Sequence, residues 1–275
     1  MVSKNQIKFV RQLEHKKFRS QLGLFVAEGP KVVGDLLAAG LRPHSIFTLA
    51  EGRSIVGEAM TGGAPLVEVS PDELCKLSLQ QHPQQMLAVF HTPRPTIDAE
   101  AWTDWSAAVA EGCHPLGRLL LMLDGVQDPG NVGTIIRLAD WFGISTIVCS
   151  PDTADAYNPK VVQASMGSIG HVSIVSTPLL PLLDLLPAEF PVYGTLLDGS
   201  DIYRQPLTPY GVVVMGNEGN GISPAVRQRV NRRLYIPCFN NSLHTAESLN
   251  VAIATAITCS EFCRRSITKL AARES

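Results

Sequence analysis

The fold class is decided by the stretch Leu120-Leu-Met-Leu-Asp-Gly-Val-Gln-Asp-Pro-Gly-Asn-Val-Gly-Thr-Ile-Ile-Arg-Leu-Ala-Asp-Trp-Phe-Gly143. Its apolar start, which includes Leu119 and ends at Asp124, predicts a strand that is covered on both faces. After the turn, apolar residues recur at helical spacing, and Gly143 is a typical helix stop. The stretch therefore predicts a strand, a polar turn and an amphipathic helix, the unit from which parallel α/β sheets are built.

Asn131 and Arg137 are the polar side chains that this unit offers at the carboxyl edge of the sheet. Open α/β folds build their ligand sites at that edge. A capping asparagine and a solvated arginine explain the same two residues equally well when the unit is taken alone. The choice depends on what the other strands bring to the same edge.

Two later segments repeat the pattern of a buried strand followed by a polar loop. The first is Gly211-Val-Val-Val-Met-Gly-Asn-Glu-Gly-Asn-Gly-Ile-Ser-Pro224, whose glycine-rich loop carries one carboxylate, Glu218. The second runs from Leu234 to Ala256, with a short strand, a polar loop and a helix of small residues that is expected to start near Ala246. Because the carboxyl ends of parallel strands share one edge, the three loops predict one composite site.

The glycine loop fails two common nucleotide-binding patterns. Gly216 begins the spacing of a phosphate-binding loop, but Ile222 stands where that loop needs its lysine. A dinucleotide fingerprint that starts at Gly219 needs a glycine at position 224, where the chain has Pro224. Glu218 would also repel phosphates, and it suits a cationic ligand or a sugar that donates hydroxyl groups.

Composition indicates a soluble protein of one or two domains. The 275 residues are 45% hydrophobic and 17% charged, which suffices for sizeable cores and argues against long disordered regions. No apolar run approaches the ~20 residues of a membrane span, and the first residues lack a secretory core, so a cytoplasmic protein without a membrane partner is expected. The six cysteines and seven histidines are dispersed, which predicts reduced core thiols and no metal site.

Three blocks of the chain match one family pattern in order and spacing. They are Asp128-Pro-Gly-Asn-Val-Gly-Thr-Ile-Ile-Arg137, Met215-Gly-Asn-Glu-Gly-Asn-Gly-Ile222, and Ile236-Pro237 joined to Ser248-Leu-Asn-Val-Ala252. Through these blocks the second half of the chain resembles the SpoU/TrmH family of RNA 2′-O-ribose methyltransferases, in the knotted SPOUT class. The resemblance implies an α/β fold with a mainly parallel sheet and a C-terminal trefoil knot, which nothing in the periodicity shows.

The chain is predicted to divide near residue 95. Residues 1–95 form a small α/β pattern in which Arg19 and Glu28 bracket the first strand. This pattern resembles the RNA-binding substrate domain of many family members, which is similar to a ribosomal-protein fold. Residues 96–117 are predicted to be a linker with a short helix around Ala101 to Glu111, and residues 118–275 the knotted methyltransferase domain.

Alternating patterns predict most of the helices and strands. In the first domain we expect strands at 23–29, 45–49 and 86–90, and helices within 1–20 and at 31–39 and 71–79. In the second domain we expect strands at 118–124, 145–149, 172–176, 191–197, 211–216 and 233–236, and helices at 131–142, 159–168, 178–186 and 223–230 before the final helix. Such alternation predicts a mainly parallel sheet between two layers of helices.

The family resemblance assigns roles to individual loop residues. The acceptor ribose would be surrounded by Asn131, Arg137, Glu218, Ser248 and Asn250. A sharply bent S-adenosylmethionine would be held at Thr195, Leu196, Gly216, Asn217, Gly221, Ile236 and Leu249, largely by main-chain groups, which glycines allow to come close. Taken alone, Ser248 and Asn250 are explained as helix caps, and Ile236 and Leu249 as core residues. The sulfonium and ammonium charges of S-adenosylmethionine suit the carboxylate of Glu218, and no metal is implied.

Methyl transfer to a ribose 2′-hydroxyl requires an oxygen held about 3 Å from the methyl carbon, and that oxygen must lose its proton. The base proposed for the family is the arginine that corresponds to Arg137. A guanidinium is a poor base, because its ordinary pKa lies far above neutral pH and it stays protonated. In a second role, Arg137 clamps the adjacent phosphate and stabilises the developing alkoxide. The sequence leaves both roles open.

Basic residues gather in two parts of the chain. Residues 1–20 hold a series of cations against the single Glu14, and residues 227–233 hold four arginines and no acid. Such patches bind phosphates, although ordinary solvated helix faces explain them as well. The candidates for RNA binding are Lys16, Lys17, Arg19 and Lys160. Gln163 and His171 differ from the residues that are usual in the family near a helix thought to face RNA, which leaves the RNA target open.

The leading hypothesis is an S-adenosylmethionine-dependent methyltransferase that acts on a ribose 2′-hydroxyl of ribosomal RNA and releases S-adenosylhomocysteine. The alternatives are methylation of tRNA, a non-catalytic RNA-binding protein of the same fold, and an unrelated α/β nucleotide-binding enzyme. The resemblance also implies a homodimer through the C-terminal domain. The helix from Ala246 to Cys263 agrees, because it is apolar or small on nearly all faces, and Trp141 and Phe142 add aromatic side chains of the kind enriched at interfaces.

Overall fold

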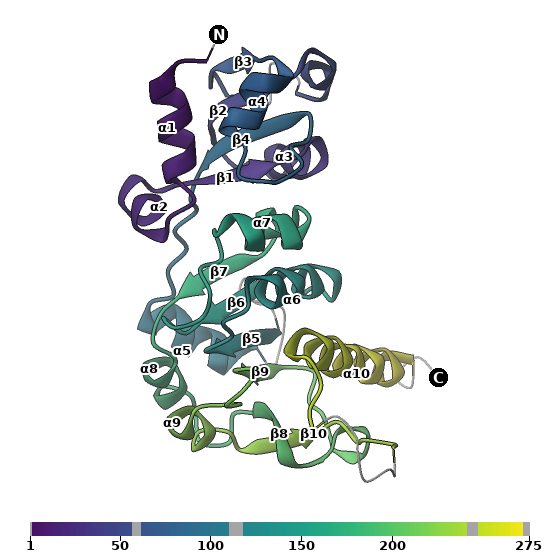
Figure 1. The fold of residues 1–275 in the computed structure, drawn as a ribbon. Helices are drawn as coiled ribbons and strands as arrows, with labels where there is room; N and C mark the ends of the chain where they lie inside the picture. Colours follow the sequence, from purple (N-terminus) through teal and green to yellow (C-terminus); the bar gives the residue numbers. More distant parts are fainter. Residues whose placement is uncertain (1, 57–61, 110–117, 241–246, 272–275) are drawn as a thin grey trace. The chain divides into compact units, whose positions relative to one another are not determined.

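A computed structural model describes residues 2–56, 62–109, 118–240 and 247–271, and the chain forms two compact units (Figure 1). Unit 1 combines the residues up to Arg94 with Asp155–His171, and unit 2 combines Pro95–Ala154 with the residues from Val172 onward. The chain thus changes unit close to the predicted boundary at residue 95. It returns to unit 1 for Asp155–His171, a segment predicted to belong to the catalytic domain, so the division into 1–95, 96–117 and 118–275 stays a prediction.

Unit 1 is built on a four-stranded sheet with the strand order β1-β4-β2-β3. The strands are β1 (Leu24–Glu28), β2 (Pro43–Thr48), β3 (Leu66–Glu68) and β4 (Met86–His91). β4 runs antiparallel to β1 and β2, and β2 runs parallel to β3. The sequence patterns predict three of these strands but not β3, because three residues are too few to show a period.

The helices of unit 1 are α1 (Lys4–Gln12), α2 (Lys16–Leu22), α3 (Pro30–Ala38), α4 (Pro71–Leu77) and α7 (Pro159–Ser165), with the short 3-10 turns η1 (Ala50–Ile55) and η3 (Ser168–Gly170). Capping boxes at Ser3 and Ser70 start α1 and α4. The basic helix predicted within residues 1–20 is two helices, because His15 adopts an extended conformation between them.

Unit 2 is built on a six-stranded sheet with the order β10-β8-β9-β5-β6-β7, in which every neighbouring pair is parallel. The strands are β5 (Leu119–Asp124), β6 (Thr146–Cys149), β7 (Ser173–Ser176), β8 (Val192–Asp201), β9 (Gly211–Gly216) and β10 (Arg232–Tyr235). The predicted strand positions are confirmed, except that β8 continues to Asp201. The parallel α/β class is confirmed, and the trefoil knot stays a prediction.

The helices of unit 2 are α5 (Ala99–Ala108), α6 (Pro129–Trp141), α8 (Leu179–Asp184), α9 (Pro224–Arg227) and α10 (Val251–Ala271), with the 3-10 turn η4 (Ile202–Arg204). Residues of α5, α8 and α9 share one hydrophobic core with the sheet, and α6 and α10 pack against each other (Figure 1). The final helix starts at Val251 and not near Ala246 as expected, because residues 247–250 are not helical and Asn250 caps the helix.

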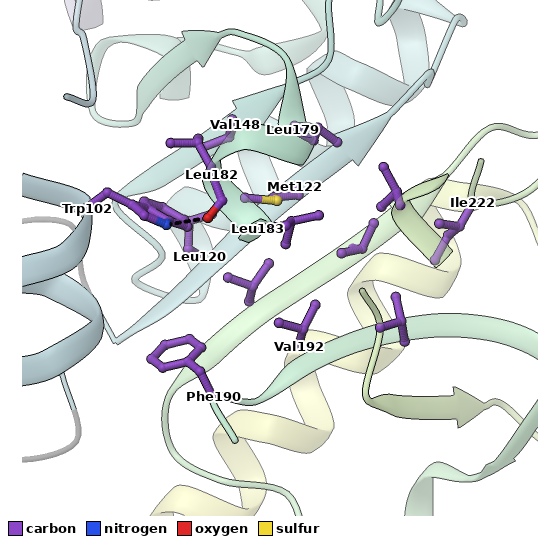
Figure 2. Packing of buried hydrophobic residues seen from close by; sticks show 14 of the residues in the cluster. Trp102, Leu120, Met122, Val148, Leu179, Leu182, Leu183, Phe190, Val192 and Ile222 are labelled. Carbon is purple, nitrogen blue, oxygen red and sulfur yellow. Dashed lines mark hydrogen bonds between the residues drawn. The ribbon is translucent and has the colours of Figure 1, made fainter. Parts of the chain in front are cut away.

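The main core of unit 2 lies between the sheet and the helices α5 and α8 (Figure 2). Trp102 and Trp105 of α5 are fully buried in it, with ring centroids 4.9 Å apart. Trp102 Nε1 donates a hydrogen bond of 2.7 Å to the carbonyl oxygen of Leu182, so the buried indole is satisfied. α5 is therefore an integral part of unit 2, although the sequence predicts a linker there.

Candidate active site

Three polar side chains from distant parts of the chain meet at the carboxyl edge of the unit 2 sheet. Asn250 Nδ2 donates to Asn131 Oδ1 at 2.9 Å, and Asn131 Nδ2 donates to Glu218 Oε1 at 2.9 Å. Asn131 stands in the first turn of α6, Glu218 in the loop after β9, and Asn250 directly before α10. The three loops thus meet in one place, and hydrogen bonds link them into a single chain of side chains.

Glu218 is held as an acceptor. Its oxygens also face the main-chain N–H groups of Gln127 at 3.3 Å and Asp128 at 3.4 Å. Desolvation acts to raise the pKa of Glu218, but the hydrogen bond from Asn131 and those from main-chain N–H groups outweigh it, so its pKa lies below the ordinary value. The side chain is therefore ionised at neutral pH and accepts hydrogen bonds without donating any.

Asn250 has a second task at the start of α10. Its Oδ1 accepts the main-chain N–H of Ala252 at 2.9 Å and of Ile253 at 3.3 Å, as a helix N-cap does. The capping explanation for Asn250 and the site explanation therefore both apply to one side chain. Since Oδ1 serves the helix, the amide nitrogen is the atom that faces Asn131.

Arg137 and Ser248 lie near this hydrogen-bonded chain in sequence but are not part of it. Arg137 stands on α6, about 9 Å along the helix axis from Asn131. Its side chain is exposed and makes no hydrogen bond or ion pair with any residue that the structure describes. Ser248 is exposed two positions before Asn250. The guanidinium of Arg137 is thus available for an anionic group brought by a ligand.

The loop after β9 is a tight turn built by Asn217. Asn217 Oδ1 accepts the N–H groups of Gly219 and Asn220 at 2.9 Å each, and its Nδ2 donates to the carbonyl of Gly125 at 2.7 Å. Asn217 and Gly221 also exchange two main-chain hydrogen bonds of 2.9 Å. Gly221 has φ +68°, a conformation that favours glycine. The loop is therefore fixed mainly by its own main chain.

Gly216 shows why this loop needs a glycine where β9 ends. A Cβ atom at Gly216 would lie 2.3 Å from the carbonyl carbon of Gly221 and 2.3 Å from the nitrogen of Ile222. Asp124, at the end of the neighbouring strand β5, adds an anchor because its Oδ2 accepts the N–H of Ser223 at 2.7 Å. Asp124 is not among the predicted site residues, although a carboxylate that ends an otherwise apolar strand is a signal for it.

β8 leaves the sheet ladder just where the predicted cofactor residues stand. β10 pairs with Gly194 and then with Ser200, so no residue from 195 to 199 has a ladder partner on β9 or β10. Thr195 is half-buried and points its hydroxyl at Met215 Sδ, at 3.7 Å, while Leu196 is buried in the core. The other two predicted cofactor residues differ in exposure, since Ile236 is half-buried after β10 and Leu249 is 49% exposed.

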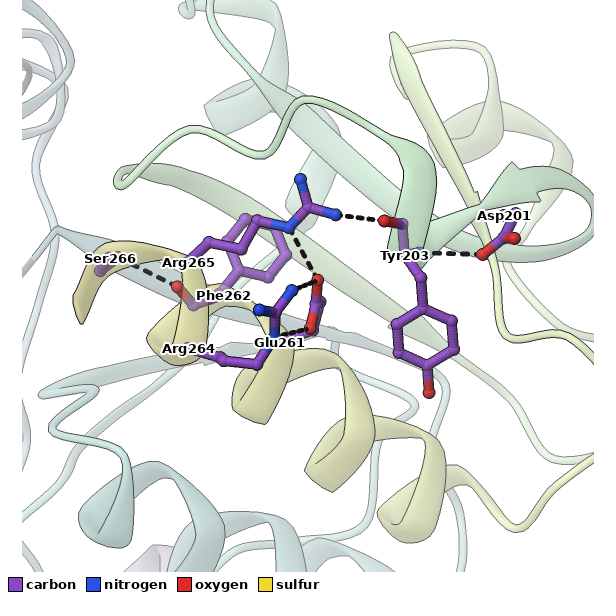
Figure 3. Close-up of polar contacts among 7 residues, drawn as sticks. All are labelled: Asp201, Tyr203, Glu261, Phe262, Arg264, Arg265 and Ser266. Carbon is purple, nitrogen blue, oxygen red and sulfur yellow. Dashed lines mark hydrogen bonds and ion pairs between the residues drawn. The ribbon is translucent and has the colours of Figure 1, made fainter. Parts of the chain in front are cut away.

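Ion pairs and hydrogen bonds of side chains hold this part of β8, where main-chain ladder hydrogen bonds to β9 and β10 are absent. Asp198 forms ion pairs with Arg227 of α9 and with Arg233 of β10, the latter at 3.4 Å. Beyond the strand, Arg265 of α10 donates to the carbonyl oxygen of Tyr203 at 2.5 Å (Figure 3). The segment 195–203 is thus fastened to α9, β10 and α10.

Glu261 orients the arginine that reaches Tyr203. Its carboxylate is almost fully buried and accepts hydrogen bonds from Arg264 at 2.8 Å and from Arg265 at 2.7 Å (Figure 3). The hydrogen bonds from Arg264 and Arg265 hold the pKa of Glu261 below its ordinary value, against the effect of burial. A buried carboxylate that is paired in this way keeps Arg265 in one rotamer.

The structure changes the interpretation of several basic residues. Lys16, Lys17 and Lys160 are exposed, as phosphate ligands must be. Arg19 is buried instead: it pairs with Asp155 at 2.5 Å and donates to the carbonyl of Leu13 at 2.8 Å. We therefore correct the assignment of Arg19 to RNA binding, because its guanidinium is fully used inside unit 1.

Three of the four arginines in segment 227–233 already pair with carboxylates. Arg227 and Arg233 share Asp198, and Arg229 pairs with Asp184 at 2.8 Å. A guanidinium that already has a carboxylate partner gains less from a phosphate, so this segment is a poor RNA-binding patch despite its composition.

Within the described ranges, no group of three or more histidine, cysteine or acidic residues is placed to hold a metal ion. No described helix is long and apolar enough to cross a membrane.

Comparison with known proteins shows the family. Residues 118–260, more than half of the chain, match the SpoU rRNA Methylase family, and residues 4–88 match the MRM3-like substrate binding domain. The 23S rRNA (guanosine(2553)-2′-O)-methyltransferase RlmP of Bacillus subtilis is 33% identical over 93% of this chain and 95% of its own length. The 23S rRNA (guanosine-2′-O-)-methyltransferase RlmB of Acinetobacter baylyi is 32% identical over 82% of this chain and 92% of its own.

Solved structures have the same fold over nearly the whole chain. A protein from Porphyromonas gingivalis assigned to the TrmH family of RNA methyltransferases superimposes with a TM-score of 0.83 and 40% identity, covering 96% of this chain and 99% of its own. An AdoMet-bound rRNA methyltransferase from Sinorhizobium meliloti gives a TM-score of 0.80 and 29% identity, covering 96% of each chain. The protein is therefore a member of the SpoU rRNA methylase family and, with it, a methyltransferase.

Proposed function

We propose that this protein transfers a methyl group from S-adenosylmethionine to a ribose 2′-hydroxyl of ribosomal RNA. The observation that carries the proposal is the hydrogen-bonded chain Asn250–Asn131–Glu218 with Arg137 on the same helix as Asn131, its guanidinium exposed and without a partner among the described residues. The relatives RlmP and RlmB, named as 23S rRNA 2′-O-methyltransferases, support the ribose of ribosomal RNA as the acceptor. The same chemistry on tRNA is the alternative, and both acceptors are consistent with a cytoplasmic protein.

The residues at the sheet edge fit S-adenosylmethionine. The ionised Glu218 belongs to the same loop as Gly216, where main-chain atoms pack too closely for any side chain. The main chain around Gly216, Ile236 and Leu249, with the β8 segment at Thr195, would hold the adenosine part. That the rRNA methyltransferase from Sinorhizobium meliloti binds AdoMet supports the choice of cofactor. S-adenosylmethionine bound there supplies an electrophilic methyl carbon, and no metal ion takes part.

Arg137 acts as an electrostatic clamp in this proposal. Its exposed guanidinium would bind the phosphate next to the acceptor ribose and stabilise negative charge that develops on the 2′-oxygen. Glu218 is a poor base, because N–H groups already occupy its oxygens and its pKa is lowered. It orients Asn131 instead, and the 2′-proton leaves to water or to the neighbouring phosphate.

Cofactor binding is the first test, and a non-catalytic protein of the same fold is the competing explanation. Calorimetric titration with S-adenosylhomocysteine in the presence of a chelator is expected to show binding, because the described residues form no metal-ligand cluster. Binding of ATP or NAD without binding of S-adenosylhomocysteine would contradict the proposed site.

Tritiated-methyl transfer to ribosomal RNA and, separately, to tRNA from a strain that lacks the gene then decides between the two acceptors. Cofactor binding without transfer to either RNA would favour the non-catalytic alternative.

The hydrogen bond from Arg265 to the carbonyl oxygen of Tyr203 gives a second prediction. Arg265→Met removes the hydrogen bond that fastens the segment after β8, so the affinity for S-adenosylhomocysteine is expected to fall about tenfold, as the loss of one charge-assisted hydrogen bond implies. The KM for S-adenosylmethionine should rise while kcat changes little. Arg229→Met is the matched control, because Arg229 also pairs with a carboxylate but lies on the α8 side, at Asp184. Equal effects of the two variants would contradict a positioning role.

We also propose that the protein is a homodimer through unit 2. Trp141 at the end of α6 is 83% exposed, and Ile253 at the start of α10 is 52% exposed. Large apolar side chains left open on two adjacent helices are typical of a surface that another chain covers. The described part of α10 thus has one face against the chain's own sheet and another that its own residues leave uncovered.

Sedimentation equilibrium tests the dimer. The full chain of 29.7 kDa is expected to sediment at twice that mass at micromolar concentration. Ile253→Glu should shift it to the mass of one chain, because a charge would be buried in the interface. Leu185→Glu is the control, since Leu185 of the α8 region is 45% exposed but belongs to another part of the surface. A wild-type protein with the mass of one chain would rule out the dimer.

A further inference from the structure

One end of the unit 1 sheet collects cations that are far apart in the sequence. The strands β1 and β2 begin at this end, and β4 ends there. Leu24 pairs with His91, and the N–H of His91 donates to the carbonyl of Arg42 at 3.0 Å. Arg94 follows β4, and its guanidinium lies over Gly23, where a Cβ atom would be 2.7 Å from Nη2. We name this group the β4-end patch; its members are Phe9, Arg42, His44, His91 and Arg94.

The cations of the β4-end patch are not neutralised. Arg42 and Arg94 are exposed, and neither has a carboxylate partner in the part of the chain that the structure describes. Burial lowers the pKa of His91, and the positive charges of Arg42 and His44 lower it further, so these three groups lie close enough to repel one another. The lowered pKa leaves His91 uncharged at neutral pH, so Arg42 and Arg94 carry the positive charge of the patch, and exposed arginines without counter-ions are typical of a surface that binds an anion.

The patch also offers ring faces. The ring centroid of His44 lies 5.3 Å from that of Phe9 on α1 and 5.8 Å from that of His91, so three rings form a continuous row. His44 is exposed, whereas Phe9 is partly buried and packs against the core of unit 1. Rings beside unpaired arginines are the combination by which proteins hold unstacked bases and their phosphates.

We infer that the β4-end patch is a docking surface for single-stranded nucleotides of the substrate RNA. The phosphates would be bound by Arg42 and Arg94, and a base would stack on His44. This inference rests on the proposed function, which supplies RNA as the partner. It selects this patch over the arginine segment 227–233, in which three of the four arginines pair with Asp184 or Asp198, and over Arg19, which is buried.

The test compares variants of the full chain by fluorescence anisotropy with in-vitro transcribed ribosomal RNA fragments at several salt concentrations. The double variant R42A/R94A is expected to bind at least tenfold more weakly, and its slope of log K against log salt should fall by about 1 to 2, one unit for each lost phosphate contact. Its affinity for S-adenosylhomocysteine should stay unchanged. Arg53→Ala is the matched control, because Arg53 is an exposed arginine of the same unit that pairs with Glu68.

Stacking is tested at His44. His44→Ala is expected to weaken RNA binding several-fold, whereas His44→Phe should keep most of the affinity because it keeps a ring. If R42A/R94A and R53A bind RNA equally well while the wild type methylates RNA, the β4-end patch is not the RNA-binding surface, and the proposed function is unaffected. If the wild type neither binds nor methylates RNA, the proposed function itself fails. Loss of binding to polyglutamate in R42A/R94A, with unchanged RNA affinity, would overturn the RNA assignment in favour of an acidic protein partner.

Discussion

Replacing Arg137 by alanine is expected to reduce methyl transfer by about a hundredfold or more, the usual cost of losing a donor that stabilises developing charge. The affinity for S-adenosylhomocysteine should change only a few-fold, because the guanidinium makes no contact with the described residues of the cofactor loops. Single-turnover transfer at saturating cofactor measures the first effect, and calorimetry measures the second. Thermal stability should be unaffected, since the side chain is exposed and pairs with none of the residues that the structure describes.

Arg137→Lys distinguishes the two kinds of contact that the clamp can make. A lysine keeps the positive charge but lacks the planar fork that binds a phosphate through two hydrogen bonds, so little activity should return. A Lys variant with a rate near that of the wild type would show that charge alone suffices. An Ala variant with the wild-type rate would remove Arg137 from the mechanism.

Gly216→Ala is expected to abolish measurable cofactor binding and to destabilise the protein by about 1 to 3 kcal/mol, the range for overpacking a dense site. The new methyl group would meet the main chain of Gly221 and Ile222 at 2.3 Å, and main-chain atoms in a turn closed by two hydrogen bonds have little room to move. The turn that follows β9 must therefore shift as a whole. Calorimetry with S-adenosylhomocysteine and a thermal melt measure the two effects.

The control for this variant lies in the same loop. A Cβ atom at Gly219 would meet only Asn217 Oδ1, at 3.6 Å, which is an ordinary contact. Gly219→Ala should therefore bind the cofactor within a few-fold of the wild type. If both variants lose binding equally, the loop is sensitive to any change and the close packing at Gly216 has no special role.

The sequence predicts the fold of unit 2 well because its signals are local. Each strand is an apolar run and each helix a periodic one, so Leu119–Asp124 and Pro129–Trp141 can be placed to within two residues. The departure of β8 from the ladder after Gly194 leaves no such signal, since it depends on which strand lies beside it. A short helix is predicted near α5, but its place in the core of unit 2 is not, because the burial of Trp102 and Trp105 depends on α8 and not on neighbours in the chain.

The candidate site, too, can be predicted from the sequence only as far as its signals are local. Asn131, Glu218 and Asn250 can be selected because each follows or precedes a recognisable element at one sheet edge. Their order in the hydrogen-bonded chain cannot be derived from spacing, and neither can the pairing of Arg19 with Asp155, which lies 136 positions further on. Local composition made Arg19 and segment 227–233 look available for RNA, and contacts with distant carboxylates occupy Arg19 and three of the four arginines in the segment.

The long separations within the site have a consequence for the newly made protein. Glu218 lies 87 positions and Asn250 119 positions after Asn131, so both partners of Asn131 are synthesised long after β5 and α6. Domains fold from the N-terminus as the chain emerges, and contacts between distant positions form last. A growing chain whose first strands have already folded still lacks the residues that orient Asn131. The proposed site is therefore complete only once α10 has docked, late in the synthesis of the chain.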